Sequence, residues 1–325
     1  MKYLLLTTTV LMTALSVQAD YKAAEEAYNN HNYTEALSEF LKEADKGDYR
    51  AQFYAGKIYL EGLGVNQNTA KGLKYIEESA RAGNDSAQAL LGYLYEEGKV
   101  VPQDKRKAIN YYKEAVARNN SSAMLNLGLA YFRGDTLPKD SQKAISLLQK
   151  VDITEVKEVG RYLGDIYMSN NEPLKALPEY QRSARMGDIP AFFSLATLFS
   201  QDASSEVQKK APEYYNYAAS QGHIPSQYIL GTMYVNGEIV EPNLYLGHAW
   251  LKMAAERDYA PAIDVKQQLD NDMSRSESEA ARREFLRLQT DVLEKVESPF
   301  VIEARIQSEL DAQNAKKIKH VRRRR

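Results

Sequence analysis

Two neighbouring stretches decide the fold. Ala51 to Gly83 reads AQFYAGKIYLEGLGVNQNTAKGLKYIEESARAG, and Ala87 to Asn119 reads AQALLGYLYEEGKVVPQDKRKAINYYKEAVARN. When the two are aligned at a period of 36 residues, a glycine coincides (Gly56 with Gly92), and a tyrosine coincides three positions later. Self-similarity at a fixed period of this length is the signature of a repeat architecture. The sequence therefore predicts stacked copies of one structural unit.

Two series of residues extend this period along the chain. The first couples a small residue to an aromatic residue three positions later, and the second is a series of lysines. The small residues are Gly56, Gly92, Gly128, Gly164, Ala196 and Gly231; the aromatic residues are Tyr59, Tyr95, Tyr131, Tyr167, Phe199 and Tyr234; the lysines are Lys71, Lys107, Lys143, Lys175 and Lys210.

Each unit is typical of two amphipathic helices, because apolar positions within residues 51–59 fall at helical spacing. Glycine inside a helix costs about 1 kcal/mol relative to alanine. Its recurrence indicates that the neighbouring helix approaches too closely for a side chain, while the tyrosine one turn later is expected to bury its ring. The second helix is expected to close on a left-handed glycine at Gly83, Gly187 or Gly222.

These motifs resemble the Sel1-like repeat family, a longer-looped relative of the tetratricopeptide repeat. The resemblance is closest for residues 51–83, 87–119 and 226–258, weaker for residues 123–151, 159–187 and 191–222, and tetratricopeptide-like for residues 30–40. It implies an all-α fold, a right-handed α-solenoid of about seven helix-turn-helix repeats. We expect the repeats to fill residues 20–262 as one extended array rather than two globular domains.

Past Ala262 the repeat stops. Ser274 to Glu277 is a capping box that predicts a helix through about Val296. Because a solenoid must cover its last apolar face, residues 263–315 are expected to form C-terminal capping helices. A final polar helix after Pro299 is expected to project or fray.

The first residues, MKYLLLTTTVLMTALSVQA, have the pattern of a secretory signal peptide, with cleavage expected after Ala19. The apolar run from Tyr3 to Leu15 is shorter than the ~20 residues that span a bilayer. Residues 1–19 are therefore predicted to be removed. The mature chain is expected to be periplasmic or secreted, without a transmembrane segment.

The net charge of −2 is the sum of an acidic body and a basic C-terminal end. Of 42 basic residues, Lys2 and seven in the last ten residues lie at the ends, which leaves 34 basic and 44 acidic residues, a charge of −10, for the body. The seven are Lys316, Lys317, Lys319, Arg322, Arg323, Arg324 and Arg325. We expect residues 316–325 to be a disordered basic tail. Either it is a frayed solubilising end, or it binds an anionic envelope surface; specific nucleic-acid binding is not expected.

Catalytic chemistry has little support. The absence of cysteine excludes disulfides, cysteine-ligated metals and cysteine nucleophiles. No two of the four histidines lie three or four residues apart, and the sequence has no G-x-S-x-G, H-E-x-x-H, P-loop or S-x-x-K motif. No catalytic residue, metal or cofactor is predicted.

Candidate binding residues follow by analogy with tetratricopeptide repeats, in which the first helix of each repeat lines the concave face. The positions three before and one after each conserved small residue supply the candidates Phe53, Lys57, Tyr93, Leu125, Leu129, Arg161, Phe193 and Tyr228. Large apolar groups on a presented surface suit a protein or peptide ligand. The alternative is that some of them belong to the core between helices, most of all Leu125 and Leu129.

The leading functional hypothesis is a non-enzymatic scaffold or adaptor in the bacterial periplasm that binds a protein or peptide on its concave face. One alternative is a secreted virulence factor that binds a host protein. Another, from a different class, is an envelope hydrolase with an unrecognised active site.

Overall fold

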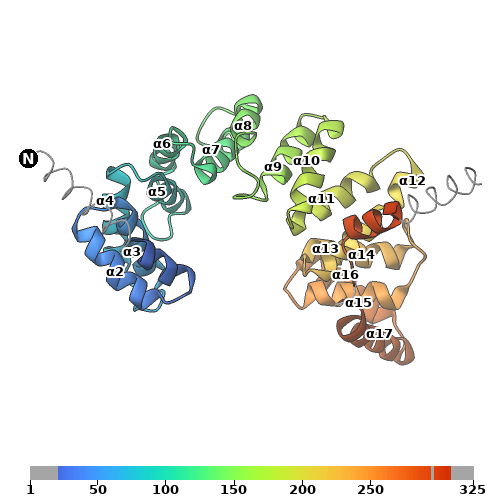
Figure 1. The fold of residues 1–325 in the computed structure, drawn as a ribbon. Helices are drawn as coiled ribbons and strands as arrows, with labels where there is room; N and C mark the ends of the chain where they lie inside the picture. Colours follow the sequence, from blue (N-terminus) through green and yellow to red (C-terminus); the bar gives the residue numbers. More distant parts are fainter. Residues whose placement is uncertain (1–20, 294–295, 309–325) are drawn as a thin grey trace, which may run out of the picture. The chain divides into compact units, whose positions relative to one another are not determined.

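The computed structural model describes residues 21–293 and 296–308, and in these residues it contains helices and no β-strand (Figure 1). Contacts divide the chain into two compact units, one ending at Val156 and the other beginning at Lys157. We call them unit 1 and unit 2. The predicted signal peptide (1–19) and basic tail (316–325) lie outside the described residues.

Unit 1 is a succession of antiparallel helix pairs. Its elements are the helical residues 21–29, then α2 (Tyr33–Asp45), α3 (Tyr49–Glu61), α4 (Thr69–Arg81), α5 (Asp85–Glu97), α6 (Lys105–Val116), α7 (Ser121–Arg133) and α8 (Ser141–Leu148). The last helix has only eight residues, and turns rather than a closing glycine follow it up to the division between the units.

Unit 2 continues the same pattern and adds a C-terminal cap. Its elements are α9 (Val159–Ser169), α10 (Pro173–Arg185), α11 (Ile189–Ser200), the short α12 (Ser205–Gln208), α13 (Ala211–Ser220), α14 (Ile224–Asn236), α15 (Leu244–Ala255), α16 (Ala260–Asp272), α17 (Arg275–Arg287), the π-helical η1 (Leu288–Val292) and the helical residues 299–308. The described residues up to α15 thus form seven pairs, which confirms the predicted all-α solenoid of about seven repeats.

The recurring glycine marks the closest approach within each pair. A Cβ added to Gly56 of α3 would lie 2.8 Å from the Ile76 side chain of α4. In the next pair, a Cβ on Gly92 of α5 would lie 2.5 Å from the Tyr112 ring of α6. These distances are too short for real side chains, so the predicted reason for the glycine is confirmed.

We expect Gly92→Ala to lower the free energy of unfolding by about 1–3 kcal/mol, the usual cost of overpacking. Alanine favours the helix by about 1 kcal/mol, but its Cβ would overlap the fully buried Tyr112 ring, which would have to shift. Urea unfolding measures the loss. The double variant Gly92→Ala/Tyr112→Leu should lose less than the sum of the single losses; additive losses would contradict this explanation.

The lysine series and the aromatic series meet in space. Lys71 Nζ lies 5.3 Å from the centre of the Tyr59 ring, and Lys107 Nζ lies 4.0 Å from that of Tyr95. The same cation–π contact joins Lys143 to Tyr131 and Lys175 to Tyr167. Each lysine begins a second helix and each ring ends a first helix, so the contact holds the two helices of a pair together across their loop.

The second helices close as predicted on residues with positive φ. Gly83, Gly187 and Gly222 have φ of 90°, 82° and 83°, a region that glycine enters without steric cost. Asn119 and Asp258 adopt the same conformation where the repeat has no glycine, with φ of 64° and 58°.

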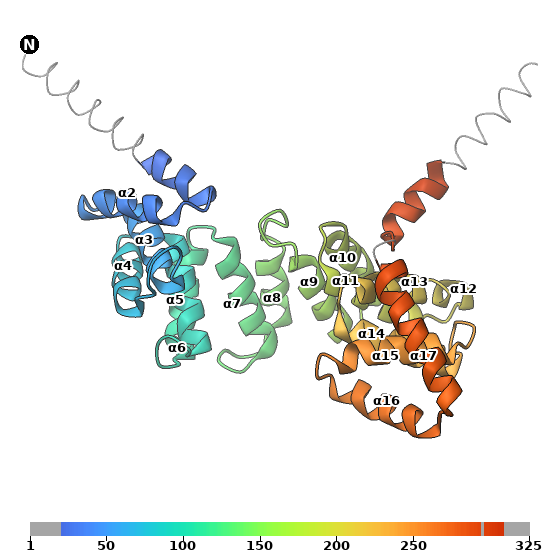
Figure 2. The ribbon, with the colours of Figure 1, turned by 90° about the horizontal axis from the view of Figure 1, so that it is seen from below.

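The C-terminal cap partly follows the prediction. Ser274 and Glu277 form the capping box that begins α17, and Ala281 and Phe285 of this helix are buried. In Figure 2, α17 lies against α15, where the Lys252 ammonium is 4.0 Å from the centre of the Phe285 ring. Helix α16, which spans the expected boundary at residue 262, was not predicted from the sequence. Like the first helices α11 and α14, α16 has an extended N-cap residue and a proline in its first turn.

The helix at residues 299–308 differs from expectation. It was expected to project or fray, but Phe300 packs on the rings of Phe192 and Tyr214, with centroid distances of 5.5 and 5.9 Å. Glu303 accepts a hydrogen bond from the Tyr214 hydroxyl at 3.1 Å. The expectation treated this helix as polar, but Phe300, Val301, Ile302 and Ile306 are apolar, and Phe300 anchors the helix on α11 and α13.

Candidate binding groove

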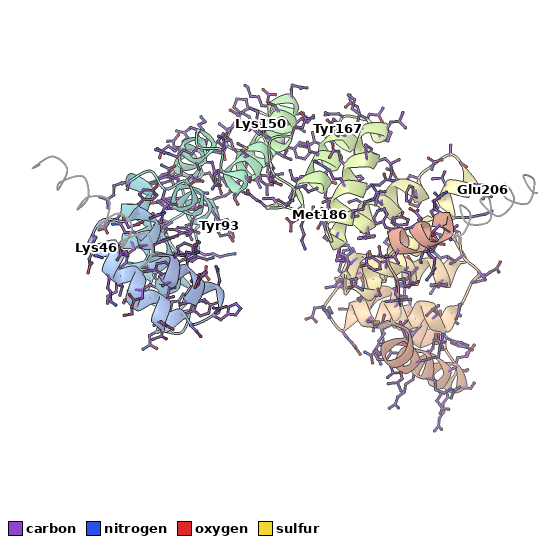
Figure 3. All side chains as sticks on the ribbon, in the orientation of Figure 1. Lys46, Tyr93, Lys150, Tyr167, Met186 and Glu206 are labelled. Carbon is purple, nitrogen blue, oxygen red and sulfur yellow. The ribbon has the colours of Figure 1, made fainter. Side chains whose placement is uncertain are left out.

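The structure brings several candidate residues of unit 1 into one groove of about 350 Å³. Phe53 and Lys57 come from α3, and Ala89 and Tyr93 from α5, so the two positions expected from each repeat converge. Tyr93 has 48% of its surface exposed (Figure 3). We call this the unit 1 groove; its lining residues are Phe53, Lys57, Ser86, Ala89, Leu90, Tyr93, Asn120, Ser122 and Asn126.

The groove combines an aromatic wall with a cation. Phe53 is half-buried and meets Tyr54 edge-on at 5.3 Å between ring centroids. Partial burial by itself lowers the pKa of Lys57, but the hydrogen bond to Tyr28 and the nearby Glu61 carboxylate together raise the pKa above its ordinary value. Lys57 is therefore a fixed positive charge beside apolar surface.

Polar groups complete the lining. Asn120 caps α7 by accepting the Ala123 N–H and also donates to Asp85. By contrast, the side chains of Ser86, Ser122 and Asn126 have no hydrogen-bond partner among the residues that the structure describes. These groups are available for a ligand's peptide backbone, which offers one donor and one acceptor per residue.

Leu125 and Leu129 do not line this groove. Both are half-buried on α7, while the neighbouring Ser122 and Asn126 contribute to the lining instead. Of the positions taken from tetratricopeptide repeats, those on α3 and α5 line the unit 1 groove and those on α7 do not.

In unit 2, Arg161 is held inside the protein. Its side chain is 18% exposed, and its Nε donates to Asp188 Oδ2 at 2.9 Å. Burial raises the pKa of the nearly inaccessible Asp188, although the Arg161 guanidinium opposes this effect. Ser183 also donates to Asp188. Both donors meet the same oxygen, Oδ2, and the Asp188 side chain makes no capping hydrogen bond to α11.

The other candidates of unit 2 also pack against neighbours. Phe193 lies 5.7 Å from the Tyr215 ring and 5.1 Å from that of His223, and Tyr228 lies 5.5 Å from Tyr259. His223 caps α14 by accepting the Ser226 N–H, and burial, with a further contribution from Arg161, lowers its pKa. These aromatic residues are half-buried, so they form a less open surface than Tyr93 does.

In residues 21–293 and 296–308, no three His, Asp or Glu side chains are grouped so that they could hold a metal ion. None of the helices in the same residues has the length and apolar character to cross a bilayer.

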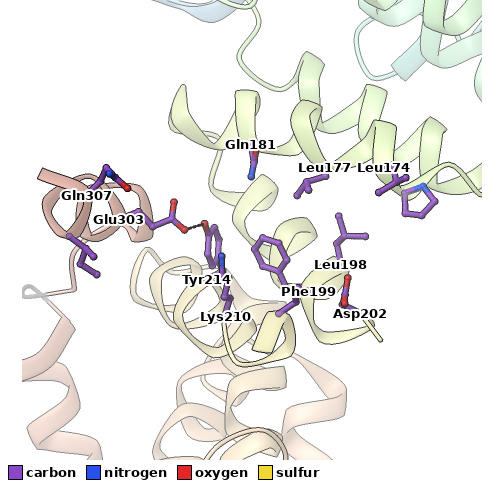
Figure 4. Close-up of a pocket in the computed structure, with 13 residues that line it drawn as sticks. Leu174, Leu177, Gln181, Leu198, Phe199, Asp202, Lys210, Tyr214, Glu303 and Gln307 are labelled. Carbon is purple, nitrogen blue, oxygen red and sulfur yellow. Dashed lines mark hydrogen bonds between the residues drawn. The ribbon is translucent and has the colours of Figure 1, made fainter. Parts of the chain in front are cut away.

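Sequence reasoning missed a larger hollow in unit 2, about 620 Å³, to which α10, α11, α13 and residues 299–308 contribute (Figure 4). We call it the unit 2 trough. One signal was available: the loop before α10 is the short SNNEP, and the leucine that follows it, Leu174, is 88% exposed. The contribution of residues 299–308 had no counterpart in the repeat pattern.

Comparisons with known proteins agree on the architecture. The Sel1 repeat family matches residues 50–84, 85–120, 121–150, 195–223 and 224–259. No curated protein matches the chain. Among solved structures, a protective antigen of uropathogenic Escherichia coli strains, described as displaying an SLR fold, is similar with 23% identity and a TM-score of 0.73 over 87% of this chain.

The present chain covers 64% of that antigen's length. A Sel1 repeat protein from Oxalobacter formigenes is similar with 26% identity and a TM-score of 0.64, over 73% of this chain and 99% of the other. The matches cover both units.

Proposed function

Because the chain belongs to the Sel1 repeat family, we propose that it is a non-enzymatic scaffold that holds a protein or peptide in the unit 1 groove. Sel1 repeat proteins are generally protein–protein interaction scaffolds. The observation that carries the proposal is the convergence of Phe53, Lys57 and Tyr93 on one hollow, with Tyr93 half-exposed. Aromatic side chains in such positions commonly dominate binding energy.

The lining suggests the character of the ligand. An apolar side chain would contact Phe53 and Tyr93, and the backbone would bond to Ser122 and Asn126. Lys57 would pair with an acidic side chain or a terminal carboxylate. The favoured ligand is therefore a peptide segment in which an apolar residue lies close to a negative charge.

The proposal also includes a location outside the cytoplasm. The signal-peptide pattern of residues 1–19 supports a periplasmic or secreted location, and scaffolding of envelope proteins is the role that we favour there. Binding to a host protein is the role to test next if the protein is found in the culture medium rather than in the periplasmic fraction.

A photo-crosslinking residue at position 93 tests the site directly. In the native organism, it should capture a partner that the same residue at position 49 does not capture. Tyr49 is a matched control, because it is also a tyrosine of a first helix, is 43% exposed and lies outside the groove. Equal capture from both positions, or from neither, would count against the groove as the binding site.

The basic tail gives a separate prediction. Deleting Lys316–Arg325 should weaken binding to vesicles rich in phosphatidylglycerol by at least about 100-fold at low salt, since each basic residue near an anionic surface contributes about 1 kcal/mol. The difference should shrink at high salt and vanish on phosphatidylcholine vesicles. A vesicle co-sedimentation assay measures it; equal binding with and without the tail would disprove the role.

A further inference from the structure

The unit 2 trough is lined by helices from two distant parts of the chain. From α10 come Leu174, Leu177 and Gln181, which lie at positions i, i+3 and i+7 and so form one stripe. Residues 299–308 contribute Glu303 and Ile306. In Figure 4, Leu198 and Phe199 of α11 lie opposite Leu174 and Leu177, and Tyr214 of α13 lies between Phe199 and Glu303. The volume of the unit 2 trough, about 620 Å³, falls within the usual range of ligand sites.

The apolar surface extends beyond the hollow itself. Leu174 is 88% exposed and Ile306 is 50% exposed, although both line the trough. Exposed apolar groups gathered at a hollow mark an interaction site. A small molecule inside the trough would leave most of Leu174 in water, whereas a protein segment lying across it would cover this side chain.

Charged groups border this apolar surface. Asp202 lies beside Leu198, at the end of the trough away from Glu303 (Figure 4). Asp202 accepts the Ser204 N–H at 2.8 Å and Glu303 accepts the Tyr214 O–H, but neither carboxylate has an ion pair among the described residues. Lys210 is the one basic residue of the described lining. An apolar centre with a charged border has the anatomy of a protein interface.

We propose that the unit 2 trough binds an amphipathic helix of another protein, with apolar residues at i, i+3 and i+7 and a basic residue at each end. The stripe on α10 spans seven residues, about 10 Å at a rise of about 1.5 Å per residue, which matches two turns of a bound helix. The basic residues of that helix lie beside Asp202 and Glu303. This site is separate from the unit 1 groove.

A labelled synthetic peptide tests the proposal with the full chain. The peptide carries leucines at i, i+3 and i+7 and arginine at both ends; one control peptide has its residues scrambled, and another has glutamate in place of arginine. Fluorescence anisotropy should show saturable binding, at least tenfold tighter than that of either control. Leu174→Glu and Ile306→Glu should each weaken it at least tenfold.

Both substitutions change exposed side chains, so circular dichroism should show an unchanged helical content. Leu286→Glu on α17, where the leucine is 49% exposed and outside the trough, is the matched control and should bind like the wild type. Equal binding of the amphipathic and scrambled peptides, or an unaffected Leu174→Glu variant, would overturn the proposal.

Three other occupants would also overturn it, and each has its own signature. Saturable binding of laurate without peptide binding would identify a small-molecule pocket. A dimer in sedimentation that Leu174→Glu converts to a monomer would identify a second copy of the chain. Peptide binding at least tenfold tighter to a variant ending at Ser308 would identify the chain's own C-terminal residues as the occupant.

Discussion

Arg161→Leu is expected to destabilise unit 2 by about 3 kcal/mol at pH 8, the typical cost of breaking a buried ion pair from one side. The substitution would remove the guanidinium that pairs with Asp188, whose side chain is only 3% exposed. Thermal or urea unfolding, followed by circular dichroism, measures the loss. As a matched control, Arg133→Leu removes an ion pair with Glu96 that is largely solvent-accessible, and should cost less than about 1 kcal/mol.

The loss should depend on pH in a definite direction. Burial already raises the pKa of Asp188 above its unfolded value, and without Arg161 the pKa should rise further. A raised pKa means that the folded state is favoured when the carboxyl is protonated. The variant should therefore lose stability as the pH rises through this folded-state pKa, and recover part of it toward pH 4.

A second variant separates charge from packing. In Arg161→Leu/Asp188→Asn the unpaired Asp188 carboxylate is gone, and asparagine is a favourable residue at the N-cap position of α11, so most of the stability at pH 8 should return. If Arg161→Leu alone lowers the free energy of unfolding by less than about 1 kcal/mol, and this loss does not vary with pH, then the ion pair of Arg161 with Asp188 does not stabilise unit 2. The sequence-based candidacy of this residue for binding would then stand.

Tyr93→Ala should lower affinity for the crosslinked partner by at least about 30-fold, which corresponds to about 2 kcal/mol for a central aromatic residue. Because nearly half of the Tyr93 side chain faces solvent, the unfolding midpoint should hardly change. Tyr49→Ala, the matched exposed tyrosine, should bind like the wild type. Isothermal titration with the purified partner measures each affinity.

Phe53→Ala should show a mixed effect. The Phe53 ring lines the groove and also packs against the buried cluster around Ile76 and Leu91, so its removal should weaken binding and also lower stability. Combining it with Tyr93→Ala is expected to abolish capture while the chain stays helical. If Tyr93→Ala binds normally, the groove is not the site; if Phe53→Ala alone unfolds unit 1, its ring belongs to the core.

The repeat period made much of the fold predictable. Gly92 and Tyr112 belong to positions that recur in neighbouring repeats, and a recurrent helical glycine is explained only by close packing. The analogy with tetratricopeptide repeats, applied at the repeat period, placed Phe53, Lys57 and Tyr93 on corresponding faces of successive first helices, and all three line the unit 1 groove.

Other features could not be predicted in this way. The pairing of Arg161 with Asp188 depends on two side chains 27 residues apart. Both stand at recurring positions of the repeat, but no other repeat has an arginine at the position of Arg161, so the period did not predict the pair. The contact between Tyr214 and Glu303 spans 89 residues and joins a helix from beyond the repeats to α13 within unit 2. The sequence therefore counted Arg161 among the exposed residues and expected residues 299–308 to project.

The sequence by itself thus determined the all-α solenoid, the number of its helix pairs and the residues on which those pairs close, because in a repeat array each unit contacts chiefly its neighbours in sequence. Only the tertiary structure decided that Tyr93 stays open while Arg161 is enclosed, and that the exposed Leu174 shares a trough with Ile306. These outcomes depend on which distant side chains fill the remaining space, and the period of the repeat carries no information about that choice.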